Sequence, residues 1–140
     1  MVLSASVLFS CGDDDTDDST DPYDQFIGSW LSTRIEFKTC NDPDNNMLIP
    51  DGLCNNGAIA CFDATFNADG SYTFVDNTEQ PAEVINGTIT VTNNTFTLCS
   101  GGFCDTFNYT FAGDGNSFNI TGDVPEDPPD CQLDIDFDKE

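Results

Sequence analysis

Short runs in which apolar and polar residues alternate constrain the fold of this chain more than any other feature of its sequence. The clearest runs are residues 106–111 and 133–138, whose apolar positions are Phe107, Tyr109, Phe111, Leu133, Ile135 and Phe137. Because a strand turns successive side chains to opposite faces, each run predicts a strand with one face in a core and the other in solvent. No run has the periodicity of a helix, and the sequence therefore predicts an all-β protein.

Residues that favour turns separate these runs and divide the chain into eight predicted strands. The predicted strands are residues 28–39, 58–67, 71–77, 83–92, 94–99, 104–111, 116–122 and 131–138. Consecutive antiparallel strands alternate in direction, so every second connection lies at the same end of the sheet. One end then holds the short turns 67–70, 92–94 and 112–115, and the other holds the longer loops 40–57, 77–82, 100–103 and 123–130.

The cysteines indicate an oxidising compartment. Six of the seven suffice for three disulfides and lie at or beside the end with the longer loops: Cys40, Cys54, Cys61, Cys99, Cys104 and Cys131. The chain has no histidine and no CxxC pair, so these thiols are not typical of a zinc site. Cys11 is the odd cysteine and needs a separate explanation.

The start of the chain explains Cys11, because it is typical of a bacterial lipoprotein. An apolar segment, residues 2–9, ends in Ser10 and Cys11, and seven aspartates follow among residues 13–24. These features resemble the signal peptide, lipidated cysteine and acidic tract of surface-exported lipoproteins of the Bacteroidetes. The resemblance implies a signal peptide at residues 1–10, which we expect to be truncated because no basic residue precedes Cys11. It also implies a lipidated Cys11 with an acidic tether at residues 11–25. We therefore expect a lipid-anchored protein of the outer membrane or cell surface, held to the membrane by N-terminal acyl chains.

Net charge limits the partners of this protein. The formal charge is -23 at pH 7, and the only basic residues are Arg34, Lys38 and Lys139. Binding to nucleic acid or to anionic lipid requires clustered Lys and Arg, so we expect neither partner. A self-repelling surface of this kind favours a monomer, and no motif in the sequence indicates a cofactor.

Several segments together resemble the lipocalin-like lipoproteins of the Bacteroidetes, within the calycin group of barrels. They are residues 28–30 (Gly-Ser-Trp), 66–74, 87–91, 96–98 and 131–139. The resemblance covers residues 23–140 and implies an eight-stranded antiparallel up-and-down barrel, which we assign to residues 26–140. It also implies that Trp30 plugs one end and that the loop 40–57 lies over the open end as a lid. Lipocalins pack an arginine over this tryptophan, and Lys139 is the candidate substitute.

Barrel closure bears on the disulfide pairing. Cys99 and Cys104 flank the predicted hairpin loop 100–103 and can bridge across it. Closure brings the end of the first strand beside the start of the last, which favours Cys40 with Cys131 and leaves Cys54 with Cys61. The alternative, Cys40 with Cys54 and Cys61 with Cys131, stays open because the second strand also starts at that end.

Inward-facing aromatic residues leave two functions open. Alternation turns about eleven rings inward: Phe37, Phe62, Phe66, Tyr72, Phe74, Phe96, Phe107, Tyr109, Phe111, Phe118 and Phe137. An eight-stranded barrel is just wide enough to be filled by side chains or to hold one small ligand. The first hypothesis is a binder of a small apolar molecule, with these expected ligand-binding residues: Phe37, Phe62, Tyr72, Phe96 and Tyr109. The second is an adhesion or interaction module with a filled core, whose rim loops, with aromatics such as Phe103, contact a protein or a glycan.

Catalysis and metal binding are not expected. The chain has no histidine and no Ser or Cys in a nucleophile motif, so we predict neither enzyme activity nor catalytic residues. Asp134, Asp136 and Asp138 follow the outer face of one predicted strand, where we expect solvated charges. The loop 40–57 offers oxygen ligands for calcium but lacks the spacing of an EF-hand, so a plain acidic loop is the preferred interpretation of Asp42, Asp44, Asn45 and Asp51.

Overall fold

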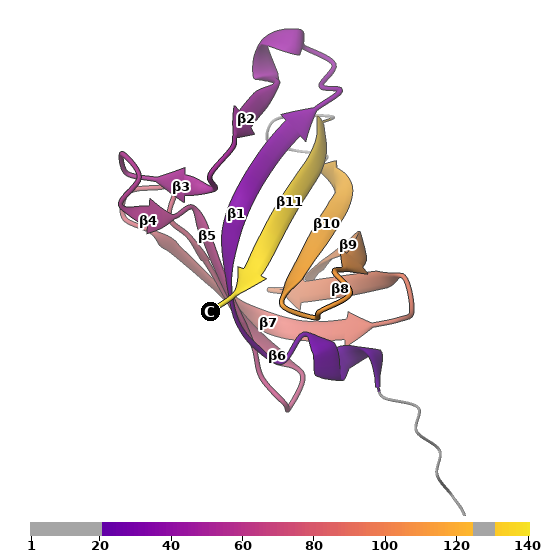
Figure 1. The fold of residues 1–140 in the computed structure, drawn as a ribbon. Coiled ribbons are helices and arrows are strands. Elements are labelled where there is room, and N and C mark those ends of the chain that lie inside the picture. Colours follow the sequence, from indigo (N-terminus) through magenta and orange to yellow (C-terminus); the bar gives the residue numbers. More distant parts are fainter. Residues whose placement is uncertain (1–20, 125–130) are drawn as a thin grey trace, which may run out of the picture.

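Eight antiparallel strands close into a barrel in the computed structural model, which describes residues 21–124 and 131–140 (Figure 1). Each barrel strand pairs with the next, and the last pairs with the first, which confirms the predicted fold class. The barrel strands are β1 (Gly28–Lys38), β5 (Phe62–Phe66), β6 (Ser71–Asp76), β7 (Glu83–Val91), β8 (Thr95–Ser100), β9 (Phe103–Phe111), β10 (Ser117–Val124) and β11 (Cys131–Lys139).

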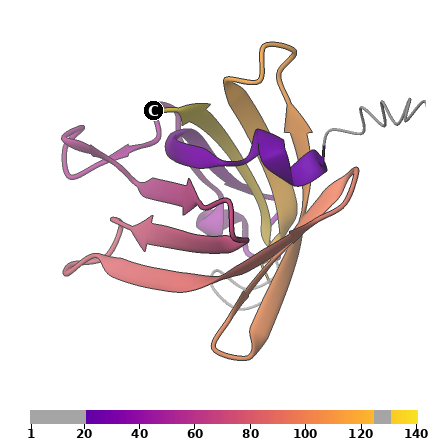
Figure 2. The ribbon, with the colours of Figure 1, turned by 90° about the horizontal axis from the view of Figure 1, so that it is seen from below.

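The two ends of the barrel differ in their connections, as the sequence predicts. We call the end with residues 67–70, 92–94 and 112–116 the turn end, and the end with residues 39–61, 77–82 and 101–102 the loop end. The β8–β9 connection at the loop end is a two-residue Gly101-Gly102 turn with positive φ at both positions. A 3-10 turn, η1 (Pro22–Gln25), lies across the turn end, as the view along the barrel shows (Figure 2).

The first strand is longer than its neighbour β5 and needs a second partner on the same edge. β5 pairs only with Gly28–Leu31, while β11 occupies the opposite edge of β1. Beyond β5, the short strand β2 (Met47–Ile49) pairs with residues 35–37. Ile49 packs against the core. β2 therefore extends the barrel wall where β1 and β5 part.

This pairing corrects the expectation that the loop 40–57 lies over the open end as a lid. The segment forms the 3-10 turn η2 (Pro43–Asn45), β2, and a small hairpin of β3 (Leu53–Cys54) and β4 (Ile59–Ala60). The predicted strand 58–67 breaks at Cys61 into β4 and β5. The apolar run 47–49 pairs with the edge of β1 that β5 leaves free, and so becomes part of the barrel wall (Figure 1).

Ser32 holds this segment against the barrel. Its side chain is buried, donates a hydrogen bond to the carbonyl of Gly52 (3.0 Å) and accepts one from the N–H of Phe62 (3.0 Å). Gly52 has φ +60°, and a Cβ there would lie 2.4 Å from the carbonyl oxygen of Ser32. Only glycine allows the segment to approach β1 so closely.

Aromatic rings fill the turn end. Phe26, which follows η1, is fully buried and packs with centroid distances of 4.9 to 5.8 Å against five rings: Phe66, Phe96, Tyr109, Phe111 and Phe118. The indole N–H of the fully buried Trp30 donates to the carbonyl of Phe26 at 2.6 Å. Trp30 and Phe26 together close this end, although the resemblance to lipocalins implied this role only for Trp30.

Candidate functional site

The inner wall of the barrel is mostly apolar, and it carries both buried and half-buried side chains. Near the turn end the inward side chains of Trp30, Phe96, Phe118 and Phe137 are buried, and three others are half-buried: Val91, Tyr109 and Phe111. Of those nearer the loop end, Phe62 is buried, whereas six remain half-buried: Phe37, Phe74, Ile85, Leu98, Phe107 and Leu133. The loop end therefore has an apolar inner surface whose side chains are not completely buried. We call these six residues the loop-end wall.

The five residues expected to bind a ligand all belong to the hydrophobic core or pack against it, but they lie in different parts of the barrel. Phe96 and Tyr109 meet in the aromatic packing at the turn end, with ring centroids 6.2 Å apart. Phe62 packs against Phe74 at 5.2 Å, and Phe37 belongs to the loop-end wall. Tyr72 is buried, at 4% exposure. Of the five, only Phe37 therefore belongs to the loop-end wall.

The loop-end wall also has an aliphatic part, which the expected ligand-binding residues do not include. Ile85, Leu98 and Leu133 share the inward face with the aromatic residues, as the ladder pairs Phe74 with Ile85. The period of two in each strand is sufficient to identify them, since each lies an even number of residues from a buried position. The same rule places Asp105 on the inward face, two residues before Phe107.

Two glycines let aromatic rings lie flat across the inner wall. A Cβ at Gly87 would lie 2.8 Å from Cε1 of Tyr72 and 2.0 Å from the carbonyl oxygen of Cys99. A Cβ at Gly122 would lie 2.6 Å from the ring of Phe107. Tyr72 on β6 thus crosses β7 toward β8, and Phe107 on β9 crosses β10. Each ring covers the backbone of a glycine, which has no side chain of its own to cover it.

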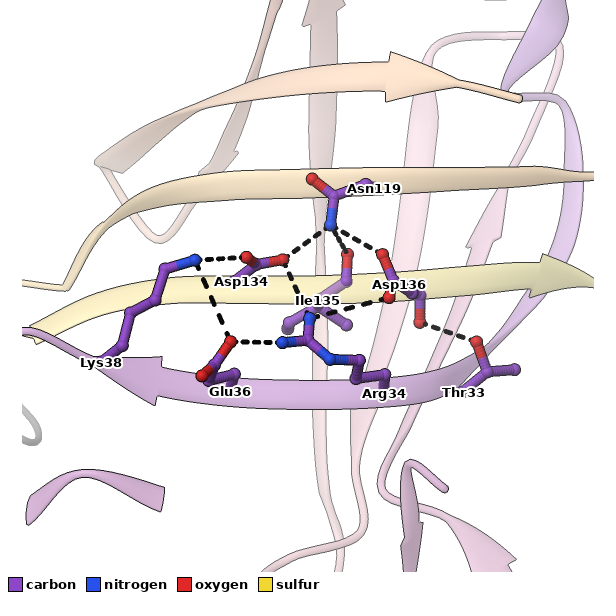
Figure 3. Close-up of polar contacts among 8 residues, drawn as sticks. All are labelled: Thr33, Arg34, Glu36, Lys38, Asn119, Asp134, Ile135 and Asp136. Carbon is purple, nitrogen blue, oxygen red and sulfur yellow. Dashed lines mark hydrogen bonds and ion pairs between the residues drawn. The ribbon is translucent and has the colours of Figure 1, made fainter. Parts of the chain in front are cut away.

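A polar network covers the outside of the seam where β11 closes on β1 (Figure 3). Lys38 Nζ lies 2.6 Å from one oxygen of Asp134, and Arg34 Nη1 lies 3.4 Å from the other. The amide N–H groups of Asn119 on β10 donate to Asp134 and Asp136, both at 2.7 Å. Glu36 pairs with Arg34. We call these six residues the seam network.

This network corrects the expectation of solvated charges along β11. The side chain of Asp134 is only 13% exposed, because Arg34, Lys38 and Asn119 surround it. Burial raises the pKa of Asp134, but the hydrogen bonds from Lys38 and Asn119 and the charges of Lys38 and Arg34 outweigh it, so this pKa lies below its ordinary value. Asp138, farther along the strand, is exposed as expected.

Three disulfides hold the loop end. Cys40 pairs with Cys131, Cys54 with Cys61, and Cys99 with Cys104, which is the pairing that barrel closure favoured over its alternative. The first joins the end of β1 to the start of β11 across 91 residues. The last bridges directly opposed residues of the β8–β9 hairpin. These cross-links indicate folding in an oxidising, extracytoplasmic compartment.

The described residues form hollows on the outside of the barrel, two of which stand out. The larger, of about 450 Å³, is lined by Thr33, Thr110, Phe111, Ala112, Ser117, Phe118, Asn119, Asp136 and Asp138. The smaller, of about 220 Å³, lies between β1 and β2. Most side chains that line the larger hollow carry hydroxyl, amide or carboxylate groups, so it suits a polar occupant.

Several other expectations concern metals, membranes and the N-terminus. Within residues 21–124 and 131–140, no group of three or more His, Cys, Asp or Glu side chains is arranged to hold a metal ion. Asp42 and Asp51 instead accept hydrogen bonds from the N–H groups of Asp44 and Leu53. No helix in the same described ranges has the length and apolar character to cross a membrane. Cys11, the predicted signal peptide at residues 1–10 and the tether up to residue 20 lie outside the described residues.

Comparison with known proteins adds no family to this description. No protein-family model matches the chain, and a search of curated proteins also finds no match.

Proposed function

We propose that this protein is a lipid-anchored lipoprotein of the outer membrane or cell surface whose barrel binds a small apolar molecule at the loop end. The observation that carries the binding proposal is the loop-end wall, where six inward apolar side chains are only half-buried. Apolar surface in water costs roughly 25 cal/mol per Å², so a ligand that covers this wall gains that free energy. The proposed role is binding and not catalysis.

A neutral fluorescent ligand tests the binding proposal. N-phenyl-1-naphthylamine emits strongly only in apolar surroundings, and we expect saturable binding to the full-length protein. Ile85→Asn places a polar group in the loop-end wall, and we expect it to weaken binding about tenfold. Val84→Asn is the matched control, because Val84 is the neighbouring residue on the outer face and is 58% exposed.

The binding test has clear outcomes against the proposal. Absence of saturable binding, or equal loss of affinity in Ile85→Asn and Val84→Asn, contradicts a site on the inner wall. Emission of the single tryptophan, Trp30, verifies that each variant is folded, since an unfolded chain would expose this buried ring. Leu98→Gln is a second wall variant if Ile85→Asn fails to fold.

The anchoring proposal rests on Cys11 and the segments around it. The six other cysteines are used in disulfides, which leaves Cys11 for another role. Mass spectrometry of the N-terminal peptide from native membranes tests this, and we expect diacylated or triacylated Cys11 at the mature N-terminus. Cys11→Ser should release the protein from the membrane fraction, since two or more chains are needed for stable anchoring. Native protein with an unmodified Cys11 contradicts the proposal.

A second candidate function is an interaction module, favoured by one observation at the tip of the β8–β9 hairpin. Phe103 is 81% exposed beside the Gly101-Gly102 turn, and the Cys99–Cys104 disulfide fixes the hairpin behind it. A rigid exposed aromatic residue is typical of a contact with a protein or glycan. Phe103→Ser should abolish binding of the protein to host or bacterial surfaces under this hypothesis, and should leave naphthylamine binding unchanged.

A further inference from the structure

We infer that the ligand of the loop-end wall is an amphiphile with a cationic head group, such as an amine attached to an apolar body, and that ligands with an anionic head are rejected. This inference rests on the proposed binding function and specifies the chemistry of its ligand. Three observations carry it: an inward carboxylate beside the apolar wall, an aromatic ring next to that carboxylate, and the placement of every basic residue elsewhere.

The carboxylate belongs to Asp105 on β9. The ladder pairs Asp105 with Leu98, an inward residue of the loop-end wall, and pairs the outward Cys104 with Cys99. Asp105 has the same parity along β9 as Phe107, Tyr109 and Phe111, which pack against the core. Asp105 itself is exposed, so its charge remains hydrated and accessible. Asp105 therefore places an acidic group at the loop end of the apolar wall, and the same parity places Asp76 and Glu83, which pair with each other, on the inward face of β6 and β7 at this end.

Tyr72 brings an aromatic ring to this carboxylate. Its side chain crosses Gly87 toward β8, as the short distance to a Cβ at that glycine shows. Burial raises the pKa of the Tyr72 hydroxyl, and the negative charge of Asp105 raises it further, which is consistent with their proximity. A carboxylate flanked by aromatic rings is a favourable site for an ammonium group, which gains ion pairing and cation–π attraction together.

Basic residues are absent from the described loop-end wall. Arg34 and Lys38 belong to the seam network on the outer face, and Lys139 lies over Trp30 at the turn end. These three are the only Lys and Arg residues of the chain, against 26 Asp and Glu. An anionic head at the loop end would face Asp105 with no cation to offset the repulsion. A cationic head is attracted by the same field.

The charge of the head group is tested with three ligands that share one apolar tail. Dodecylamine, dodecanol and dodecanoate, each below its aggregation limit, compete with N-phenyl-1-naphthylamine on the full-length protein. We expect dodecylamine to bind about tenfold more tightly than dodecanol, and dodecanoate to bind most weakly. Asp105→Asn should weaken the preference for the amine and leave the affinity for dodecanol unchanged. Asp123→Asn is the control, because it removes the same charge from an exposed outer position of β10.

The outcomes separate this inference from the proposed function. If all three ligands bind equally, or if Asp123→Asn reduces the amine preference as much as Asp105→Asn, the inference is wrong while binding at the wall stands. If the neutral naphthylamine also fails to bind, the result contradicts the proposed function. The inference about the head group is then contradicted as well, because it depends on that function. Loss of the amine preference in 0.5 M salt for the wild type, with dodecanol unaffected, supports the electrostatic origin.

Discussion

The ammonium group of Lys139 lies over the ring of Trp30, 5.3 Å from its centroid, at the turn end of the barrel. Trp30 lies on the first barrel strand and Lys139 on the last, so the contact links the two strands that close the barrel. The side chain of Lys139 passes over Gly28, where a Cβ would lie 3.2 Å from its Cε. The lysine thus takes the place expected for it over the tryptophan.

Replacement of Lys139 tests the contribution of this contact. Lys139→Met keeps an apolar stem over the ring but removes the charge, and we expect the free energy of unfolding to fall by about 0.5 to 1 kcal/mol. Lys139→Arg should retain the wild-type value. Urea denaturation followed by Trp30 emission measures both. Equal stability of Lys139→Met and wild type would show that the cation contributes nothing.

The seam network predicts a pH-dependent contribution of Asp134. Its pKa is lowered in the folded protein, so its ionised form stabilises the fold above the unfolded value of about 3.9 and loses this effect as the pH falls through the folded value. At neutral pH, Asp134→Asn should lower the free energy of unfolding by about 2 kcal/mol. The difference from wild type should shrink as the pH falls below about 4. Urea denaturation at a series of pH values measures it.

The matched control for this prediction is Asp138→Asn. Asp138 lies on the same outer face of β11 but is exposed, so its replacement should change stability by less than about 0.5 kcal/mol. A comparison of variants cancels the general effect of acid on a protein with such a large negative charge. A pH-independent difference between Asp134→Asn and wild type contradicts the prediction.

Ser32 is predicted to couple the 39–61 segment to the barrel. Ser32→Ala leaves the N–H of Phe62 and the carbonyl of Gly52 without this partner, and we expect a loss of about 1 to 3 kcal/mol. Hydrogen exchange should accelerate at Phe62 and in β2. Ser29→Ala is the control, because the Ser29 hydroxyl makes only a 3.4 Å contact with Thr65. Unchanged exchange in Ser32→Ala contradicts this coupling.

The disulfides are predicted to differ in their contribution to stability. Cys40–Cys131 closes a loop of 91 residues, and in the chain-entropy account its removal costs about 4.5 kcal/mol. Cys99–Cys104 spans only five residues, for which the same account gives about 2 kcal/mol. Paired Cys→Ser variants compared by thermal unfolding measure this order. A reversed order would show that local strain or native contacts outweigh chain entropy.

Alternation along the chain was sufficient to predict the barrel strands, because inward positions of a closed sheet must be apolar wherever they meet the core. It did not reveal β2 or the break at Cys61. The run 47–49 is uniformly apolar and too short to show a period, and its pairing depends on an edge of β1 that β5 leaves free. Alternation also did not predict the buried position of Phe26, since this residue follows a 3-10 turn and lies outside every alternating run.

The amino-acid order by itself determined which faces of the strands are apolar, where the turns fall and which cysteines are available, because these depend on local periodicity and residue type. Tertiary structure alone decided that Asp134 is enclosed by Arg34 and Lys38, and that the ring of Tyr72 extends toward Asp105. The first relationship depends on register between β1 and β11, which lie far apart in the chain, and the second on Gly87, which allows the ring of Tyr72 to approach closely. A period of two along a strand predicts which face of the sheet a side chain lies on. Which side chains it contacts depends on how the strands pair when the barrel closes.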